Sequence, residues 1–250
     1  MHCAQRCPQG ACQLCIRSRN QQGYLPRRAY PGRRKSLEGV RPRQASVHPG
    51  LGEALKLLEF GEPPNIVWRP FELNPNLPKS GLDRRAYRTA KFGWERSQAM
   101  DREVAETGKT LGLTFNYDQV FVTPNTLDGH RLLWWARETG SQDALAEALF
   151  RAYFSEGHDL GKLEVLTDVA AEVGLSREQV RRFLQSDHGR GEVLAEEREA
   201  RRRGLNSVPF FILNGIPAFA GAQPPGTFIE AFRQVRGTDA KACGPDSCSV

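Results

Sequence analysis

The chain has 250 residues, of which 39% are hydrophobic and 26% are charged. A chain of this length can bury a substantial core, so a wholly disordered protein is excluded. No run approaches the roughly 20 apolar residues that a membrane span needs, and the first residues lack the apolar centre of a secretory signal. We therefore expect a soluble, cytoplasmic protein that does not act at a membrane.

The positive charge is concentrated at the N-terminus. Residues 1–50 hold nine Arg and one Lys against the single acid Glu38, whereas the remaining 200 residues hold 25 basic and 28 acidic residues. The body of the protein is slightly acidic, which argues against nucleic acid as its partner. One alternative stays open, in which the basic arm binds nucleic acid or another anionic partner without catalysis.

The first 60 residues change character near residue 50. Residues 1–50 contain five prolines among scattered Arg and show no sustained period, so we expect an irregular arm there. An apolar helical face begins at Leu51 and ends at Gly61. The segment 65–71 is short and β-rich, and it predicts a strand.

From residue 82 to about residue 204 the pattern is helical. Ser176 and Gln179 form a capping box, which predicts the start of one of these helices. The other predicted helices cover 84–112, with a break near Gly93, and 126–138, 141–156, 162–174 and 191–203.

The last part of the chain returns to the strand pattern. Residues 208–213 and 216–220 predict two strands, and the Asn214-Gly215 pair between them predicts a hairpin turn. Residues 227–235 predict an amphipathic helix that closes the domain.

All six cysteines lie near the two ends of the chain, at Cys3, Cys7, Cys12, Cys15, Cys243 and Cys248. This distribution favours redox or metal chemistry over a secreted disulfide framework. Cys12 and Cys15 have the spacing of a redox pair, and a short helix over Gln13–Gln22 with Cys12 at its N-cap is an alternative to an irregular arm there. The four N-terminal cysteines are too closely spaced for the usual two-knuckle zinc site, so we expect no metal and no cofactor.

Several segments carry a resemblance to a known family. They are Trp68 to Pro75, Pro124 to Arg131, Leu149 to Phe154, Ser207 to Gly215 and Ala220 to Pro224. Together they resemble the signatures of DsbA-like oxidoreductases, particularly the FrnE-like subgroup, over about residues 51–235. The resemblance implies an α/β fold, with a thioredoxin-like mixed sheet that is interrupted by an all-helical insertion domain.

The resemblance also implies a domain organisation. Residues 51–80 and 205–237 would form the thioredoxin-like domain, and residues 81–204 the helical insertion. Residues 1–50 would precede them as an atypical basic arm, and residues 238–250 would follow as a flexible tail with a cysteine pair.

The activity that the resemblance implies is that of a thiol-disulfide oxidoreductase or disulfide isomerase acting on protein thiols or disulfides. Such a site needs a cysteine pair at the N-terminus of the first sheet-packing helix, where the helix dipole favours a thiolate. The second cysteine resolves the mixed disulfide formed by the first. A cis Val208–Pro209 bond would expose backbone on which an extended substrate lies.

Two further pairs of residues are candidates for the site, and the first of them follows from the same resemblance. Cys243 and Cys248 are expected to form an auxiliary dithiol in the tail. Asn125 and His130 are expected to lie in the substrate groove, although a half-buried helix histidine is the more frequent case for His130.

The N-terminus departs from the family. The length of the helix that ends near Gly61 places the active-site cysteines near residues 38–48, where the sequence has none. Either Cys12 and Cys15 work from the basic arm, or residues 1–50 are not the family's N-terminus and reflect an altered reading frame or start. A further alternative is a glutathione-dependent isomerase resembling 2-hydroxychromene-2-carboxylate isomerase, whose site uses glutathione and no cysteine pair.

One charged run near residue 200 has a simpler interpretation. Arg198, Arg201, Arg202 and Arg203 end a predicted helix, where positive charge matches the helix dipole. Acidic residues at 196, 197 and 199 neutralise them. We therefore expect this run to form a solvated helix face.

Overall fold

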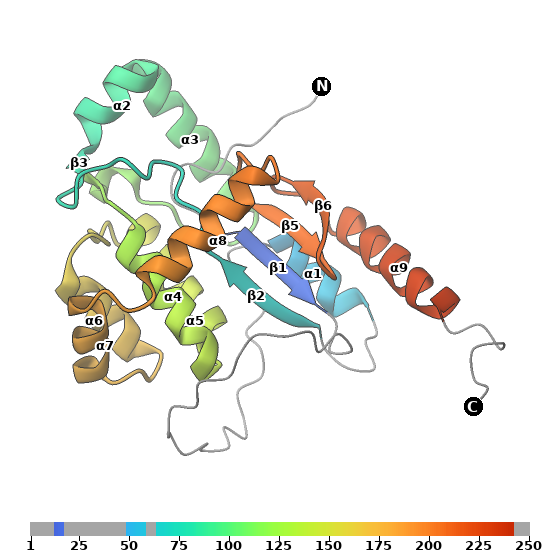
Figure 1. Ribbon diagram of the computed structural model, residues 1–250. Coiled ribbons are helices and arrows are strands. Elements are labelled where there is room, and N and C mark those ends of the chain that lie inside the picture. The colour runs from blue at the N-terminus through green and yellow to red at the C-terminus, as the bar shows by residue number, and fades with distance from the viewer. Residues whose placement is uncertain (1–12, 18–48, 59–63, 243–250) are drawn as a thin grey trace.

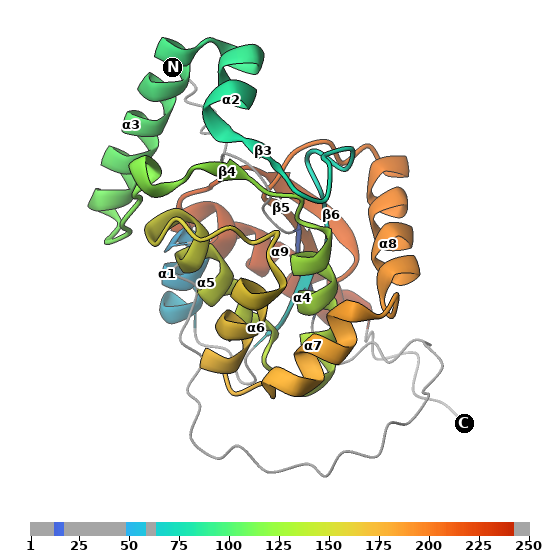
Figure 2. The ribbon, with the colours of Figure 1, turned by 90° about the vertical axis from the view of Figure 1, so that its left-hand side faces the viewer.

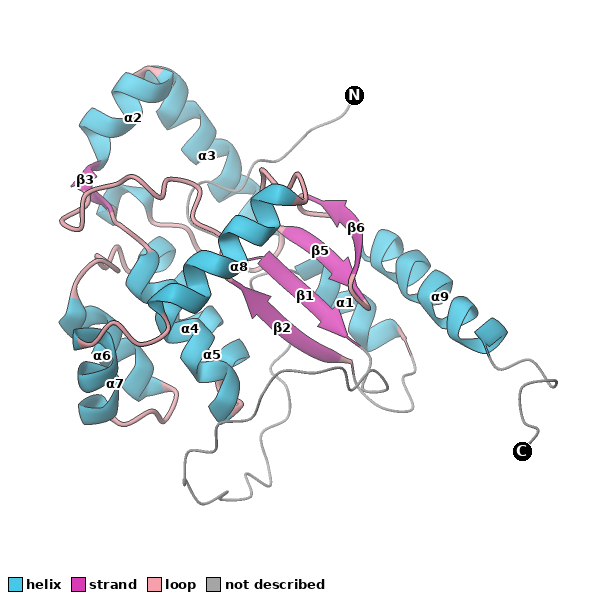
Figure 3. Cartoon of the chain, in the orientation of Figure 1, coloured by secondary structure: helices cyan, strands magenta, loops and turns pink. Residues whose placement is uncertain are grey.

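Figure 1 shows the computed structural model of the chain, which describes residues 13–17, 49–58 and 64–242. A four-stranded sheet of order β2-β1-β5-β6 lies among the helices (Figure 3). Its strands are β1 (Gln13–Arg17), β2 (Asn65–Arg69), β5 (Phe210–Leu213) and β6 (Ile216–Ala220). β2 and β5 belong to the same mixed sheet, which confirms the predicted fold class.

Helices cover both faces of this sheet because its strand residues alternate between two hydrophobic clusters. Phe211 and Leu213 pack with residues of α1 (Pro49–Leu57) and α9 (Pro225–Ala242). Ile212, which lies between them, packs with Ala200 of α8 (Arg190–Arg202) on the opposite face. Figure 1 shows α8 in front of the sheet and α1 behind it.

Between β2 and β5 the chain is mostly helical, as predicted. Figure 2 shows the α2–α3 pair projecting at one end and α6 and α7 lying at the other. In the described part of the chain, no helix has the length and hydropathy of a membrane span. The elements are β3 (Leu82–Asp83), α2 (Arg84–Phe92), α3 (Trp94–Thr110), η1 (Tyr117–Gln119), β4 (Val122–Thr123), α4 (Leu127–Thr139), α5 (Gln142–Phe150), η2 (Arg151–Ser155), α6 (Leu163–Glu172), α7 (Arg177–Gln185) and α8.

Local signals in the sequence locate several boundaries in this region. The predicted break at Gly93 separates α2 from α3, with a φ of 80° at the glycine. Ser176 caps α7 and accepts a hydrogen bond from the backbone N–H of Gln179, as the capping box predicts. The expectation of an all-helical insertion is wrong in one detail, because β3 and β4 form a short antiparallel ladder whose strands are each two residues long.

The hairpin between β5 and β6 forms at the predicted pair. Asn214 has a φ of 49° and Gly215 a φ of 85°. Positive φ at both central residues is the requirement of a type I′ turn, whose twist matches that of the flanking strands. The Asn-Gly signal therefore gives both the position and the type of the turn.

The expectation of an irregular arm is wrong for residues 13–17, and so is the alternative of a helix from Gln13. These residues form β1, the strand that separates β2 from β5. Without a strand in this position, the facing backbone groups of β2 and β5 would lack partners, at a cost of roughly 1–3 kcal/mol for each buried group. A short segment satisfies them. The remainder of that alternative helix, from residue 18 to residue 22, lies outside the described residues.

The direction of β1 is unusual for its place in the chain. Strands joined through a helix normally run parallel, because the crossover returns the chain to the same end of the sheet. β1 instead pairs antiparallel with β2, with Gln13 opposite Arg69, and parallel with β5, with Leu14 opposite Phe211. The start of β1 therefore lies at the end of the sheet where β2 ends and β5 begins.

The insertion is joined to the sheet at Trp68, which is 1% exposed. The side chain of Gln142 accepts a hydrogen bond from the Trp68 N–H at 3.0 Å and donates one to the Trp68 carbonyl at 3.0 Å. The same amide donates to the Leu133 carbonyl at 2.9 Å, and the Trp68 indole N–H donates to Asp143 at 3.0 Å. The first turn of α5 thus acts as a partner for the outer edge of β2.

These hydrogen bonds between Gln142 and Trp68 predict the effect of Gln142→Ala on stability. The substitution leaves two buried carbonyls and one buried N–H without the amide partner, so we expect the free energy of unfolding to fall by about 2–4 kcal/mol. Gln98→Ala, at an exposed position of α3, is the matched control and should change it by less than about 0.5 kcal/mol. Urea unfolding followed by circular dichroism measures both. Equal stabilities of the two variants would contradict this role of Gln142.

Candidate active site

The loop that leads into β5 contains the Val208–Pro209 peptide bond, which is cis as predicted. Val208 is 7% exposed and packs in a cluster with Phe71 and Ile212. The carbonyl of Pro209 accepts a hydrogen bond from the Gly221 N–H at 2.8 Å. The loop is therefore fixed by the packing of Val208 and by the hydrogen bond from the segment that follows β6.

The start of α1 lies against the same segment. A Cβ placed on Gly50 would lie 2.1 Å from the carbonyl oxygen of Gln223, so only glycine allows this close approach. Because Gly221 bonds to Pro209 and Gln223 touches Gly50, a segment of three residues joins the Pro209 loop to the start of α1. The helix start and the proline thus lie at one end of the sheet.

The cysteines do not lie where the resemblance implies an active site, at the start of the first sheet-packing helix. Cys15 lies within β1, where its Cα is opposite those of Val67 and Ile212. Cys12, Cys243 and Cys248 lie outside the described residues, as do Cys3 and Cys7. The described start of α1, from Pro49 to Leu57, carries no cysteine. Cys12 directly precedes Gln13, the residue at which the chain enters the sheet beside the end of β2.

A buried charged layer lies beside this end of the sheet. Glu72 is 2% exposed and Glu197 of α8 is 1% exposed. The Glu72 N–H donates to the Glu197 carboxylate at 3.1 Å, and Arg201 donates to the Glu72 carbonyl at 2.7 Å. Arg201 also pairs with Glu197 at 3.1 Å and lies over the ring of Phe71 at 4.7 Å. Phe71 connects this layer to Val208.

The two carboxyl groups of this layer titrate abnormally. Burial, helped by the charge of Glu197, raises the pKa of Glu72 to about 7 against the opposing charge of Arg201. Burial also raises the pKa of Glu197, although its bonds with Arg201 and with the Glu72 N–H oppose the change. Glu72 Oε1 is buried and has no hydrogen-bond partner. A protonated Glu72 is therefore the form that this environment favours near neutral pH.

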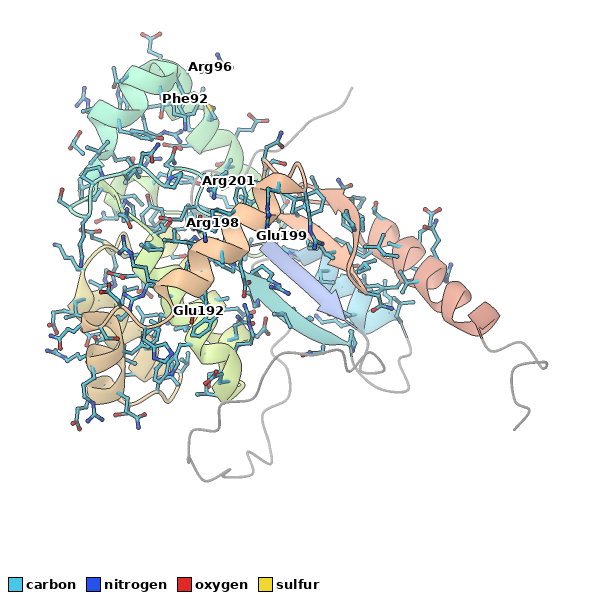
Figure 4. All side chains as sticks on the ribbon, viewed as in Figure 1. Phe92, Arg96, Glu192, Arg198, Glu199 and Arg201 are labelled. Atoms are coloured by element: carbon cyan, nitrogen blue, oxygen red, sulfur yellow. The ribbon has the colours of Figure 1, made fainter. Side chains whose placement is uncertain are left out.

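The expectation that the arginine run forms a solvated face is wrong for its inner side. Figure 4 shows Glu192, Arg198, Glu199 and Arg201 along α8, and of these Arg201 reaches into the buried layer. Glu196 pairs with Arg69 at 2.9 Å and with Arg137 at 3.1 Å. Burial alone would raise the pKa of Glu196, but the hydrogen bonds and charges of Arg137 and Arg69 lower it.

Asn125 lies two residues before α4, and His130 lies in the first turn of that helix. The Asn125 amide donates to the Leu77 carbonyl at 2.8 Å and accepts from the Leu127 N–H at 3.1 Å, so it ties the 74–78 loop to the start of α4. His130 is 3% exposed, so it is more deeply buried than the half-buried helix histidine that was the alternative to a site role. It also lines a cavity of about 60 Å³. Burial lowers the pKa of His130 to about 4, so its imidazole is neutral at physiological pH.

The described residues contain no group of three His, Cys, Asp or Glu side chains able to hold a metal ion. The residues that sequence reasoning missed are Glu72 and the inner face of α8. One signal was available for Glu197, because it lies four residues after Val193 and three before Ala200, on the buried stripe of the helix.

Comparison with known proteins identifies the family. A family model described as DSBA-like thioredoxin domain matches residues 53–233, so the chain belongs to this family. The uncharacterized protein YwbO of Bacillus subtilis (strain 168) is 27% identical over 175 residues, which cover 68% of this chain and 80% of that protein. The crystal structure of a probable DsbA oxidoreductase from Streptomyces coelicolor is 28% identical, with a TM-score of 0.67, over 96% of this chain and 99% of that one.

The abnormal titration of Glu72 predicts how stability depends on pH. Because its pKa is raised in the folded state, the folded protein holds this proton between pH 4.5 and about 7 while the unfolded chain releases it. The stabilisation that this proton provides is complete below pH 4.5 and is lost as the pH rises through about 7. Glu72→Gln removes this loss. We therefore expect the difference in free energy of unfolding between the variant and the native chain to be about 1–3 kcal/mol more favourable to the variant at pH 8 than at pH 4.5.

The measurement is urea unfolding from pH 4.5 to 8, compared between Glu72→Gln and the native chain. His130 has the opposite linkage, since its lowered pKa removes stability as the pH falls from 6.5 towards 4. The difference between the two proteins isolates Glu72 from this effect. Glu192→Gln, at an exposed position of α8, is the control. Parallel pH profiles for Glu72→Gln and the native chain would contradict the assignment.

Proposed function

We propose that this protein catalyses thiol-disulfide exchange on protein clients, as a FrnE-like member of its family. The observation that carries the proposal is the arrangement at one end of the sheet, where the Pro209 loop, Gly221 and the start of α1 lie together. The family membership over residues 53–233 supports the same chemistry. An extended client would lie along the Pro209 loop as an added strand, with its disulfide beside that loop.

Cys12 is the nucleophile in this proposal. Its thiolate attacks one sulfur of a client disulfide, forms a mixed disulfide and releases the other client sulfur as a thiolate. Cys15 then attacks the Cys12 sulfur, which releases the second client thiolate and leaves a Cys12–Cys15 disulfide. The two electrons gained by the client come from the two protein thiols, and the reverse sequence oxidises a client dithiol.

The position of Cys15 in β1 sets a condition on the second step. Three residues of extended chain separate Cα atoms by roughly 10 Å, whereas a disulfide needs roughly 4.4–6.8 Å. The resolving step therefore requires the first residues of β1 to leave their extended conformation. We expect this local opening to limit the rate at which the mixed disulfide is resolved.

Serine variants test these roles. Cys12→Ser should lower reductase turnover with dithiothreitol and a reducible protein at least about 100-fold, because a serine hydroxyl does not replace a thiolate as nucleophile. Cys15→Ser should keep the attack and accumulate the mixed disulfide, which mass spectrometry without reductant detects. Cys3→Ser is the matched control and should keep full turnover. Full turnover in Cys12→Ser would contradict the proposal.

We further propose that Cys243 and Cys248 form an auxiliary dithiol that exchanges with a second molecule. α9 starts two residues after Gln223, near the Pro209 end, and its 18 residues carry the chain about 27 Å away. Cys248 follows Ala242 by six residues, which span at most roughly 20 Å. Because α9 leads the chain away from the Pro209 loop over 18 residues, we propose exchange with a second molecule rather than within one chain.

Exchange between molecules predicts a dependence on protein concentration. Reoxidation of the reduced protein, followed by thiol titration, should become faster per molecule as its concentration rises. Cys248→Ser should remove this dependence and leave the thermal unfolding midpoint unchanged. A reoxidation rate that is independent of concentration but slowed by Cys248→Ser would assign the exchange to a single chain instead.

A further inference from the structure

The outer side of α8 carries a row of positive charge near its C-terminal end. Residues three and four apart are neighbours on a helix surface, so Arg198 lies beside both Arg201 and Arg202. At about 3.6 residues per turn, Glu192 and Glu196 lie on the other side of the helix. Arg198, Arg201 and Arg202 therefore form an arginine row along α8, of which Figure 4 labels the first two.

Carboxylates neutralise this arginine row only in part. Arg201 pairs with the buried Glu197 at 3.1 Å. Arg202 pairs with Glu199, which also pairs with the arginine that follows. Arg198 is exposed and has no ion-pair partner among the residues that the structure describes. Because like charges three and four residues apart destabilise a helix, the stability of α8 does not explain the row.

The C-terminal end of α8 is fixed beside the Pro209 loop. The Arg201 guanidinium lies 4.7 Å over the ring of Phe71, which packs in one cluster with Val208. The Leu205 N–H donates to the Ala200 carbonyl at 3.1 Å, which turns the chain at the end of the helix. Leu205 and Ala200 both belong to the same cluster as Val208. One layer of side chains thus connects the arginine row to the loop.

We infer that the arginine row binds an Asp or Glu side chain of the client polypeptide, close in the client's sequence to the cysteine that reacts at the Val208–Pro209 loop. The inference rests on the proposed function, because that function places an extended client at this loop. A guanidinium suits a carboxylate, since it donates two parallel hydrogen bonds to the two oxygens.

The charge of the whole chain favours a polypeptide over a nucleic acid as the occupant. Residues 51–250 hold 25 basic and 28 acidic residues, so the surface around the arginine row does not extend its positive charge. A long polyanion needs many cations along its backbone, whereas one or two carboxylates need only this row.

Binding of short peptides tests the inference without any redox step. The probes are dye-labelled nonapeptides with Ser in place of Cys at the centre, and with Asp, Asn or Lys two residues before or after it. Fluorescence anisotropy with the full chain at low ionic strength should show Asp binding about tenfold tighter than Asn at one of the two positions, and Lys binding more weakly still. In about 0.5 M salt the difference should fall below about twofold, because exposed charges are then screened.

Charge reversal in the arginine row separates this binding from a change in folding. Arg198→Glu combined with Arg202→Glu should reverse the order, so that the Lys peptide binds about fivefold or more tighter than the Asp peptide. Arg201 stays unchanged, because it also holds the buried layer. The matched control is Arg181→Glu with Arg182→Glu on α7, at the end of the molecule opposite the α2–α3 pair (Figure 2). It makes the same change in net charge and should keep the preference for Asp.

Three results would overturn the inference. They are equal affinity for the Asp and Lys peptides, a preference for Asp that charge reversal leaves unchanged, and binding of an oligothymidylate of the same length without any preference among the peptides, which would assign the row to nucleic acid. The disulfide forms of the same peptides separate this inference from the proposed function. Absence of turnover with every disulfide contradicts the oxidoreductase, whereas equal turnover of the Asp and Lys disulfides contradicts the role of the arginine row.

Discussion

The outer edge of β2 is closed by a side chain rather than by another strand, and the rest of the molecule depends on this contact. An exposed strand edge presents unpaired backbone groups that need partners when they are buried. Gln142 supplies both a donor and an acceptor to Trp68, and Asp143 holds the indole. The insertion is thereby fixed to the sheet, so that Phe150 on α5 reaches both the cavity and the Val208 cluster.

The central position of the sheet shows a second constraint of the same kind. β2 and β5 lie one strand apart, and the backbone groups that face the gap accept a strand of either direction, because parallel and antiparallel ladders both pair N–H with C=O. β1 fills the gap with five residues in which only Leu14 and Ile16 alternate as apolar positions. A pattern this short has little weight in the sequence, which explains why a strand was not expected there.

Interactions between residues close together in the chain made much of the fold predictable, whereas interactions between distant residues could not be predicted. The Ser176 cap, the break at Gly93 and the Asn214-Gly215 turn depend on residues next to one another in the chain. The buried layer of Glu72 and Glu197 depends on residues 125 positions apart, which no local pattern brings together. The family resemblance located the Pro209 loop, but the position of Cys15 within a strand departs from it.

Burial acts in opposite directions on two titratable groups, Glu72 beside the sheet and His130 in the insertion, yet it leaves both uncharged over one range of pH. It raises the pKa of Glu72 to about 7 and lowers that of His130 to about 4, so both groups are neutral between these values. For each group the loss of hydration on burial is the largest cause of the shift, because it penalises the charged form. The low polarity of the surroundings, rather than a neighbouring charge, therefore sets the direction of both pKa shifts.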